Sequence, residues 1–146
     1  MLTVRRFRVD DYFAIDRRRF DMLTYLNFPD PQAMAENLHK GPAETIINSR
    51  HIIASYGIVP FWKGVGEAWA VTSDLVTEHG VFFAKTVFRG LVRTMDELKL
   101  DRVQTSVDVD HLVSRKWVEW MGFRNEGNMR KYIGGHDYIR YALVRS

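Results

Sequence analysis

The sequence predicts an α/β fold of the α+β kind, in which one mixed sheet carries helices on both faces. Short segments of alternating apolar and polar residues recur along the chain, as in strands with one buried face. Between them lie segments whose apolar residues return every three or four positions, as in amphipathic helices. The order β-α-α-β-β-β-α-β-α-β-β favours one layered domain over residues 1–146.

The first part of the chain predicts one strand and two helices. Leu2–Phe7 alternates well enough for a strand. Asp10 or Asp11 can cap the first helix. Asp30–Pro31 is a stronger start signal, because a capping residue precedes proline at the first helical position. We expect this second helix to stop at Gly41–Pro42.

Three strands should follow, at Thr45–Asn48, His51–Trp62 and Glu67–Ser73. Turn-forming residues separate them. Gly57 interrupts the long middle strand, so we expect a bulge or a bend there.

The last part of the chain predicts two strand–helix units and a hairpin. The clearest helix has apolar residues at three- and four-residue steps from Val81 to Leu98. A strand at Val103–Asp108 precedes a helix that Asp110 can cap, and Gly122 can end that helix in the left-handed conformation. The final hairpin is expected to pair the following segments: Arg124–Tyr132 and Asp137–Leu143, around Gly134-Gly135.

Composition excludes several classes of protein. The sequence contains no cysteine, which excludes disulfides, zinc–thiolate sites and cysteine nucleophiles. No apolar run approaches the ~20 residues of a membrane helix, and the N-terminus lacks the apolar core of a signal peptide. We therefore expect a soluble, cytoplasmic protein without a membrane partner. The five histidines are scattered without metal-ligand spacing, so no metal site is expected.

Basic residues cluster twice near the N-terminus although the net charge is only +3. The simplest interpretation is solvated faces. Attraction to an anion, such as a nucleotide phosphate or a nucleic acid, is the alternative. Aromatic and basic residues do not interleave as in RNA-binding modules, so nucleic-acid binding is not expected. The clusters are Arg5, Arg6 and Arg8, and Arg17, Arg18 and Arg19.

The element order and two late motifs resemble the GNAT N-acetyltransferase superfamily over nearly the whole chain. The resemblance implies a sheet splayed between its fourth and fifth strands, Glu67–Ser73 and Val103–Asp108. Acetyl-coenzyme A would lie in that gap. Its pyrophosphate would sit on the N-terminus of the next helix, where unpaired amides and the helix dipole favour anions.

The pyrophosphate motif of that family is eroded here. In the segment Thr77–Phe82 only Gly80 matches, and Glu78 adds a negative charge near the expected anion. Backbone amides could still bind the phosphates, with His79 helping if it is protonated. The resemblance implies the following residues for cofactor binding: Trp69, Val71, Ser73, His79, Gly80, Val81, Phe82 and His111.

The second family signature covers His111–Phe123. The family's tyrosine, often the general acid for the departing thiolate, falls on Val118, which cannot donate a proton. Ser114 or a nearby tyrosine would have to replace it. Glu67 is the best candidate for the base that deprotonates the amine, and Asp74 is the second choice. The candidate tyrosines are Tyr132, Tyr138 and Tyr141.

Two functions follow from the resemblance. The first is an acetyl-CoA-dependent N-acetyltransferase acting on an amine, of a small molecule or of a protein, by direct attack. The second is a catalytically inactive GNAT scaffold, such as a phage virion protein or a partner-binding component, since small phage-encoded GNAT-like proteins also resemble the Gly66–Asp74 segment. A homodimer or virion partners, and a place in the phage particle, would then be expected. In an inactive scaffold, Phe82 or Phe83 should fill the gap between the strands.

Overall fold

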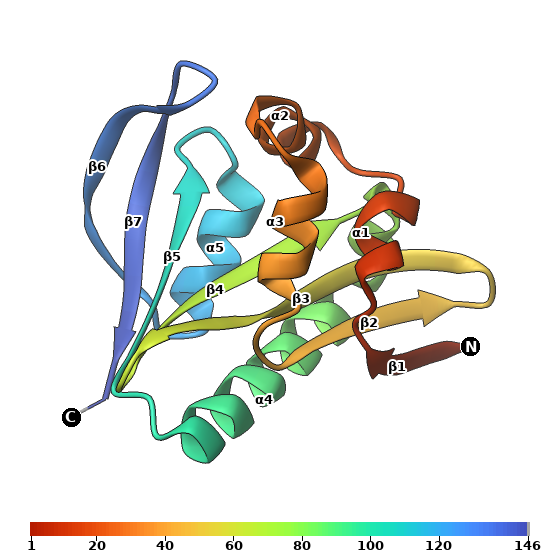
Figure 1. Ribbon diagram of the computed structural model, residues 1–146, viewed down its shortest axis with the longest axis horizontal. Helices are drawn as coiled ribbons and strands as arrows, with labels where there is room; N and C mark the ends of the chain where they lie inside the picture. Colours follow the sequence, from red (N-terminus) through yellow and green to blue (C-terminus); the bar gives the residue numbers. More distant parts are fainter. Residues whose placement is uncertain (146) are drawn as a thin grey trace.

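A computed structural model describes residues 1–145 of the chain. Its centre is a seven-stranded sheet of order β1-β2-β3-β4-β5-β7-β6 (Figure 1), in which only β4 and β5 run parallel. The strands are β1 (Leu2–Arg6), β2 (Ala43–Asn48), β3 (His51–Trp62), β4 (Val65–Thr72), β5 (Arg102–Asp108), β6 (Arg124–Ile133) and β7 (His136–Val144). The helices are α1 (Val9–Ala14), α2 (Arg19–Asn27), α3 (Pro31–Leu38), η1 (Asp74–His79, of the 3-10 type), α4 (Gly80–Leu98) and α5 (Leu112–Trp120).

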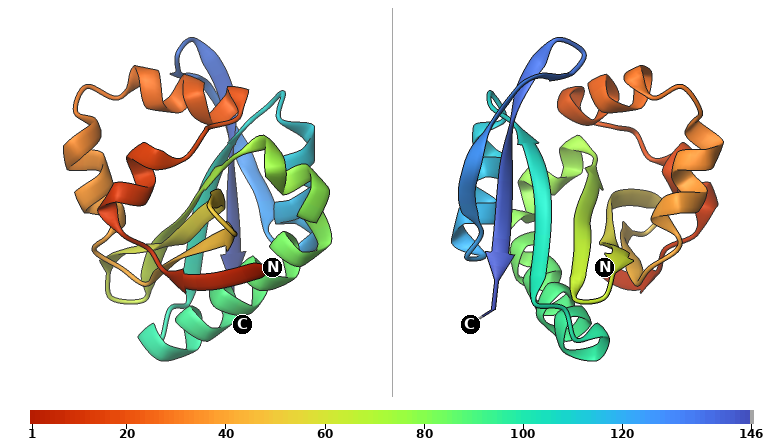
Figure 2. Two further views of the ribbon diagram at one scale, coloured as in Figure 1. Left: turned by 90° about the vertical axis from the view of Figure 1, so that its right-hand side faces the viewer. Right: turned by 60° about the vertical axis from the view of Figure 1, so that its left-hand side comes forward.

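Helices cover both faces of this sheet, as the sequence predicts. Figure 2 shows α1, α2 and α3 on one side and α4 and α5 on the other. On the first side, Phe7 and Tyr12 pack with Ala35 of α3. On the second side, Leu91 and Met95 of α4 are buried in a core cluster with residues of β5 and β7. Within residues 1–145, no helix is both long and apolar enough to cross a membrane.

The first helical region differs from the prediction. Neither Asp10 nor Asp11 is the N-cap residue of the first helix, because α1 begins at Val9, after Arg8. Asp11 lies in the first turn, where its carboxylate accepts from the Arg8 amide at 2.9 Å and so still satisfies one amide at the helix start. The same carboxylate accepts from the Arg5 guanidinium at 2.7 and 2.8 Å and from the Thr45 hydroxyl at 2.8 Å. Helix α2 is a separate element that the apolar pattern does not reveal.

Helix caps were predicted with mixed success. Asp30 caps α3 as expected, its Oδ1 accepting from the Ala33 amide at 3.1 Å. Asp110 does not cap α5, because His111 takes that role: its Nδ1 accepts from the Ser114 amide at 3.1 Å. Gly122 follows α5 with a φ of +103°, which confirms its expected left-handed conformation.

Gly57 does not form the expected bulge. It pairs in register with Ala43 and Trp69, and the irregularities of β3 lie elsewhere, at Ile46/Ile47 and Pro60/Trp62 of the neighbouring ladders. A side chain at position 57 would lie 2.6 Å from both the Ala43 Cβ and the Pro42 carbonyl oxygen. The glycine is therefore needed where β2 enters the sheet closely against β3.

The splayed sheet is confirmed. The parallel pairing of β4 and β5 covers three positions and ends at Glu67 opposite Gln104. Just beyond, the Thr105 hydroxyl still donates to the Ala68 carbonyl at 2.9 Å. Both strands then continue unpaired with each other, to Thr72 and Asp108, and a V-shaped gap opens between them.

Candidate active site

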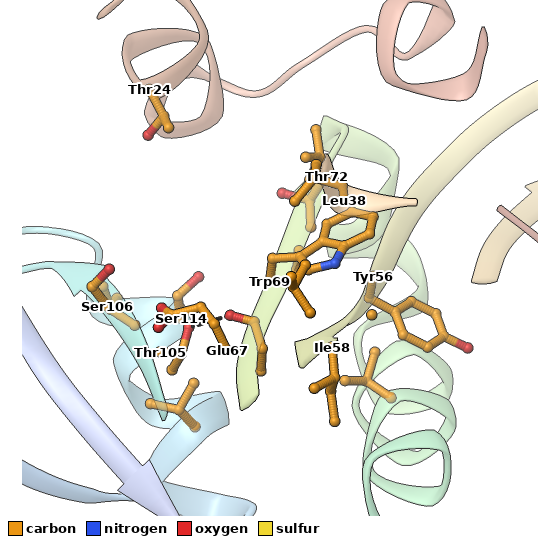
Figure 3. Close-up of a pocket in the computed structure, with 18 of the residues that line it drawn as sticks. Thr24, Leu38, Tyr56, Ile58, Glu67, Trp69, Thr72, Thr105, Ser106 and Ser114 are labelled. Atoms are coloured by element: carbon orange, nitrogen blue, oxygen red, sulfur yellow. Dashed lines mark hydrogen bonds between the residues drawn. The ribbon is translucent and has the colours of Figure 1, made fainter. Parts of the chain in front are cut away.

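The gap between β4 and β5 holds a cavity of about 850 Å³. This volume lies within the range of small-molecule sites. Figure 3 shows Glu67, Trp69 and Thr72 of β4 facing it, with Ser106 of β5 and Ser114 of α5 on the other side. Ala70, on the same central strand, is exposed.

Neither phenylalanine fills the gap. Phe82 lies outside the cavity lining, with 37% of its surface exposed. Phe83 is buried and forms part of the wall, where its ring contacts Trp117 of α5 at a centroid distance of 4.8 Å. The feature that would mark an inactive scaffold is therefore missing from the described residues.

Glu67 occupies the narrow end of the gap, at the last paired position of β4. Its Oε1 accepts from Gln104 Nε2 at 3.2 Å and from Arg140 Nη1 at 3.1 Å, and Arg140 lies 3.2 Å from Oε2. Burial raises the pKa of the Glu67 carboxyl, and the charge of Arg140 opposes that rise. The result is a fixed carboxylate with a pKa shifted towards that of a useful base.

Along β4, the backbone hydrogen-bonding groups of successive residues point alternately to β3 and to the gap. The Ser73 amide donates to the Ile53 carbonyl at 2.9 Å, so it points to β3 and is not available for the main-chain contact predicted for it. By strand alternation, the backbones of Trp69 and Val71 also face β3. Their side chains, however, line the cavity on the α1–α3 side. The gap-facing backbone groups belong to other residues: Ala68, Ala70 and Thr72.

Asp21 of α2 lies at the wide end of the gap, where sequence reasoning did not place a functional residue. Its Oδ2 accepts from the Thr72 amide at 2.9 Å and from the Thr72 hydroxyl at 2.6 Å. The Arg18 amide donates to the Thr72 carbonyl at 3.0 Å. Burial raises the pKa of Asp21, with these hydrogen bonds opposing the rise. Asp21 and the Arg18 amide therefore hydrogen-bond both backbone groups of Thr72, the last residue of β4 that faces the gap.

The predicted pyrophosphate loop lies where η1 meets α4. Gly80 starts the 19-residue helix α4, and no atom comes within 4 Å of the side-chain position that it lacks. Val81 is 72% exposed, and neither its side chain nor those of His79 and Phe82 line the cavity. Contacts from this loop would therefore come from its backbone at the start of α4.

His111 and Ser114 form a coupled pair at the start of α5. His111 Nδ1 accepts from the Ser114 amide, so a neutral ring carries its proton on Nε2, 3.3 Å from Ser114 Oγ. Burial and the nearby Arg18 lower the pKa of His111, which favours that neutral form. If the ring donates to the serine oxygen, the serine hydroxyl is free to donate into the cavity.

The remaining candidates lie in different places. Tyr132 and Tyr138 line the cavity, and the Tyr138 hydroxyl lies 3.3 Å from Thr24 Oγ1. Tyr141 points away, because its hydroxyl donates to Glu119 at 2.6 Å. Asp74, the second choice for a base, is exposed at the start of η1 and does not line the cavity.

Sequence reasoning missed Arg140 and Gln104 beside Glu67. Arg140 comes from β7, and the register of the sheet places it opposite Ser106. Strand alternation could have assigned Gln104 and Arg140 to the Glu67 face, but only if the neighbour order β4-β5-β7 had been known. The basic cluster at positions 17–19 is not simply solvated: the Arg17 guanidinium lies between the rings of Tyr12 and Tyr25, at 4.4 and 4.1 Å.

No protein-family model matches the sequence, and no curated protein matches it either. Solved structures do match. A GNAT-family acetyltransferase from Bacillus anthracis gives a TM-score of 0.72 at 18% identity, covering 98% of this chain and 94% of its own. The ribosomal-protein-S5-alanine acetyltransferase from Vibrio fischeri gives 0.76 at 17% identity, covering 99% and 93%. The chain has the GNAT fold.

A third match was solved with ligands. The spermidine N-acetyltransferase from Vibrio cholerae, in complex with CoA and spermine, gives a TM-score of 0.74 at 17% identity, covering 99% of this chain and 95% of its own. At such identities the likeness establishes the fold alone.

Proposed function

We propose that this protein is a GNAT-type N-acetyltransferase that moves an acetyl group from acetyl-CoA to an amine, of a small molecule or of a protein, by direct attack. The main support is the cavity between β4 and β5, which has a partly buried carboxylate, Glu67, at its narrow end. The cavity is lined by α4 and α5 on one face of the sheet and by α2 and α3 on the other. Two substrates could therefore meet at Glu67 from opposite sides.

The residues present fit acetyl-CoA in part. The gap-facing backbone of Ala68 and Ala70 suits an amide-containing arm, and the open start of α4 at Gly80 suits a pyrophosphate. Thr72 would contribute only if Asp21 released it. When bound, acetyl-CoA would supply the acetyl group and a thiolate leaving group.

Glu67 would take the proton from the ammonium group of the acceptor, directly or through water. Arg140 and Gln104 hold its carboxylate in place, which fixes the direction of proton transfer. Ser114 is the candidate to replace the missing tyrosine acid, since it lines the cavity and its hydroxyl oxygen lies 3.3 Å from His111 Nε2. Positioning would carry most of the rate, because a serine hydroxyl is a weak acid.

Calorimetric titration with acetyl-CoA tests the binding step. We expect micromolar binding to the wild type and its loss in Gly80→Trp, because the new ring would cover the amides at the start of α4. The surroundings of Gly80 are open, so the variant should fold. Val92→Trp, on an exposed position of the same helix, is the matched control and should bind normally. No binding to the wild type at millimolar acetyl-CoA would refute the proposal and favour the inactive scaffold.

Glu67→Gln tests the chemical step. In a screen of amines, we expect it to lower kcat by roughly 100-fold or more while acetyl-CoA binding is retained, as for the loss of a general base. Glu97→Gln, an exposed acid on α4, should leave the rate unchanged. A Glu67→Gln enzyme with wild-type kcat would remove Glu67 from the proton transfer.

A further inference from the structure

Three metal-ligating side chains meet outside the acyl-transfer residues, where the β5–α5 turn lies beside the β6–β7 hairpin (Figure 1). Asp108 ends β5, Asp110 lies in the turn, and His136 begins β7. One donor atom from each of these side chains lies within 4.8 Å of the other two. Two carboxylates and an imidazole form a ligand set that suits divalent transition metals.

The buried carboxylate of Asp108 is the second observation that points to a ligand. Asp108 is only 3% exposed. Its Oδ1 accepts from the Asp110 amide at 2.9 Å, but its buried Oδ2 accepts no hydrogen bond from the described residues. A buried carboxylate oxygen without a partner is costly, so a compensating positive charge is expected.

His136 lies close to this oxygen but is poorly aligned with it. Its Nδ1 is 2.9 Å from Asp108 Oδ2, yet the contact is an ion pair by distance and lacks the alignment of a hydrogen bond. Two atoms bound to one metal ion at about 2.1 Å each, with an angle near 90°, lie about 3.0 Å apart. The lone pairs of both ligand atoms then point at the metal ion and not at each other. The observed 2.9 Å separation of His136 Nδ1 and Asp108 Oδ2 agrees with this distance.

We propose that Asp108, Asp110 and His136 form a binding site for one divalent first-row transition-metal ion. The ion would bind Asp108 Oδ2 at the buried floor of the site and His136 Nδ1 beside it. The exposed carboxylate of Asp110 would close the set from the turn, leaving positions for water. The bound ion would link the end of β5 to the start of β7. It would therefore hold in place the part of the cavity wall formed by Asp108 and Tyr138.

Zinc titration of the EDTA-treated and dialysed protein tests this site without acetyl-CoA. By calorimetry with ZnCl₂ we expect one ion per chain, and a rise in the thermal unfolding temperature. His136→Ala and Asp110→Asn should each weaken binding about 10-fold or more, because each removes a direct ligand. Both side chains are accessible to solvent, so these variants should fold where changes at buried Asp108 could fail.

His51→Ala is the matched control, since His51 is exposed at the far end of β3 and belongs to no ligand cluster in the described residues. It should bind zinc as the wild type does. Absence of zinc binding below millimolar concentration would overturn the proposal, and so would unchanged affinity in both ligand variants.

Discussion

Glu67 owes its properties to two opposing effects. Burial disfavours its charged form, while Arg140 and Gln104 stabilise it by charge and hydrogen bonds. The net result is a raised pKa. A group whose pKa is raised in the folded state contributes stability below its unfolded pKa and loses it as the pH rises through the folded pKa.

Arg140→Gln should therefore destabilise the protein in a pH-dependent way. Without the arginine the pKa of Glu67 rises further, so ionised Glu67 becomes more costly to bury. We expect the free energy of unfolding to fall by about 1–3 kcal/mol at pH 7, and by clearly less near pH 3, below the ordinary pKa of glutamate, where Glu67 is protonated in both states. Urea unfolding at the two pH values measures the difference.

Arg93→Gln is a control for the loss of an arginine on the surface. Its partner is Glu44 at 3.1 Å, and the Arg93 side chain is 53% exposed, so the loss should stay within about 1 kcal/mol. Equal destabilisation of Arg140→Gln at both pH values would contradict the assigned role of the arginine. If the protein acetylates amines, the acidic limb of its pH–rate profile should also move to higher pH in Arg140→Gln.

Two glycines show how differently elements use this residue. Gly57 lies where the start of β2 runs closely beside β3, and a methyl group would meet atoms of Pro42 and Ala43 at 2.6 Å. Gly80 has a helical φ of −58° at the start of α4 and open space around it. The first glycine is required by packing, and the second leaves room for a ligand.

Alanine substitution should separate these roles. Gly57→Ala should lower the free energy of unfolding by about 1–3 kcal/mol, because the added methyl group overpacks the β2–β3 junction. Gly80→Ala should raise it by about 0.4–1 kcal/mol, because its backbone conformation suits alanine and the unfolded chain loses freedom. Chemical denaturation measures both. If Gly57→Ala and Gly80→Ala both raised the free energy of unfolding by the same amount, the β2–β3 junction would have to relax around the added methyl group.

The sheet as a whole is divided along the β4–β5 gap. Three parallel residue pairs join the β1–β4 part of the sheet to the β5–β7 part. Helix α4 packs against both parts, on one face of the sheet. Ala70 lies on a central strand but is exposed at this division. A central strand normally has both edges hydrogen-bonded, so the open edge is a property of the whole arrangement.

Hydrogen exchange should show this open edge directly. The amides of Val71 and Ser73 face β3 and should be strongly protected, whereas the Ala70 amide faces the gap and should exchange roughly 100-fold faster or more. The Thr72 amide should be protected although it faces the gap, because Asp21 accepts from it. NMR-detected exchange measures each amide. Uniform protection along β4 would mean that the gap is closed in solution.

Local sequence patterns were sufficient to predict most helices and strands of this fold. The α4 helix, the 51–62 strand, the Asp30 cap and the final hairpin depend on residues close in sequence, whose preferences act over one or two turns. The resemblance to the GNAT superfamily, which rests on the element order and two late motifs, then implied the splayed sheet. Strand alternation predicted that Glu67, Trp69, Val71 and Ser73 share one face of their strand. The first three line the cavity, and Ser73 does not.

Contacts between distant residues were decided only by the tertiary structure. Thr45, 34 residues later in the chain, donates to the Asp11 carboxylate, which also accepts from the Arg8 amide at the start of α1. Arg140 reaches Glu67 from a strand 73 residues later in the chain. The amino-acid pattern determined which elements form, because that depends on neighbours along the chain. It could not determine which charges meet in the gap, because that depends on strand order and on how far the strands diverge.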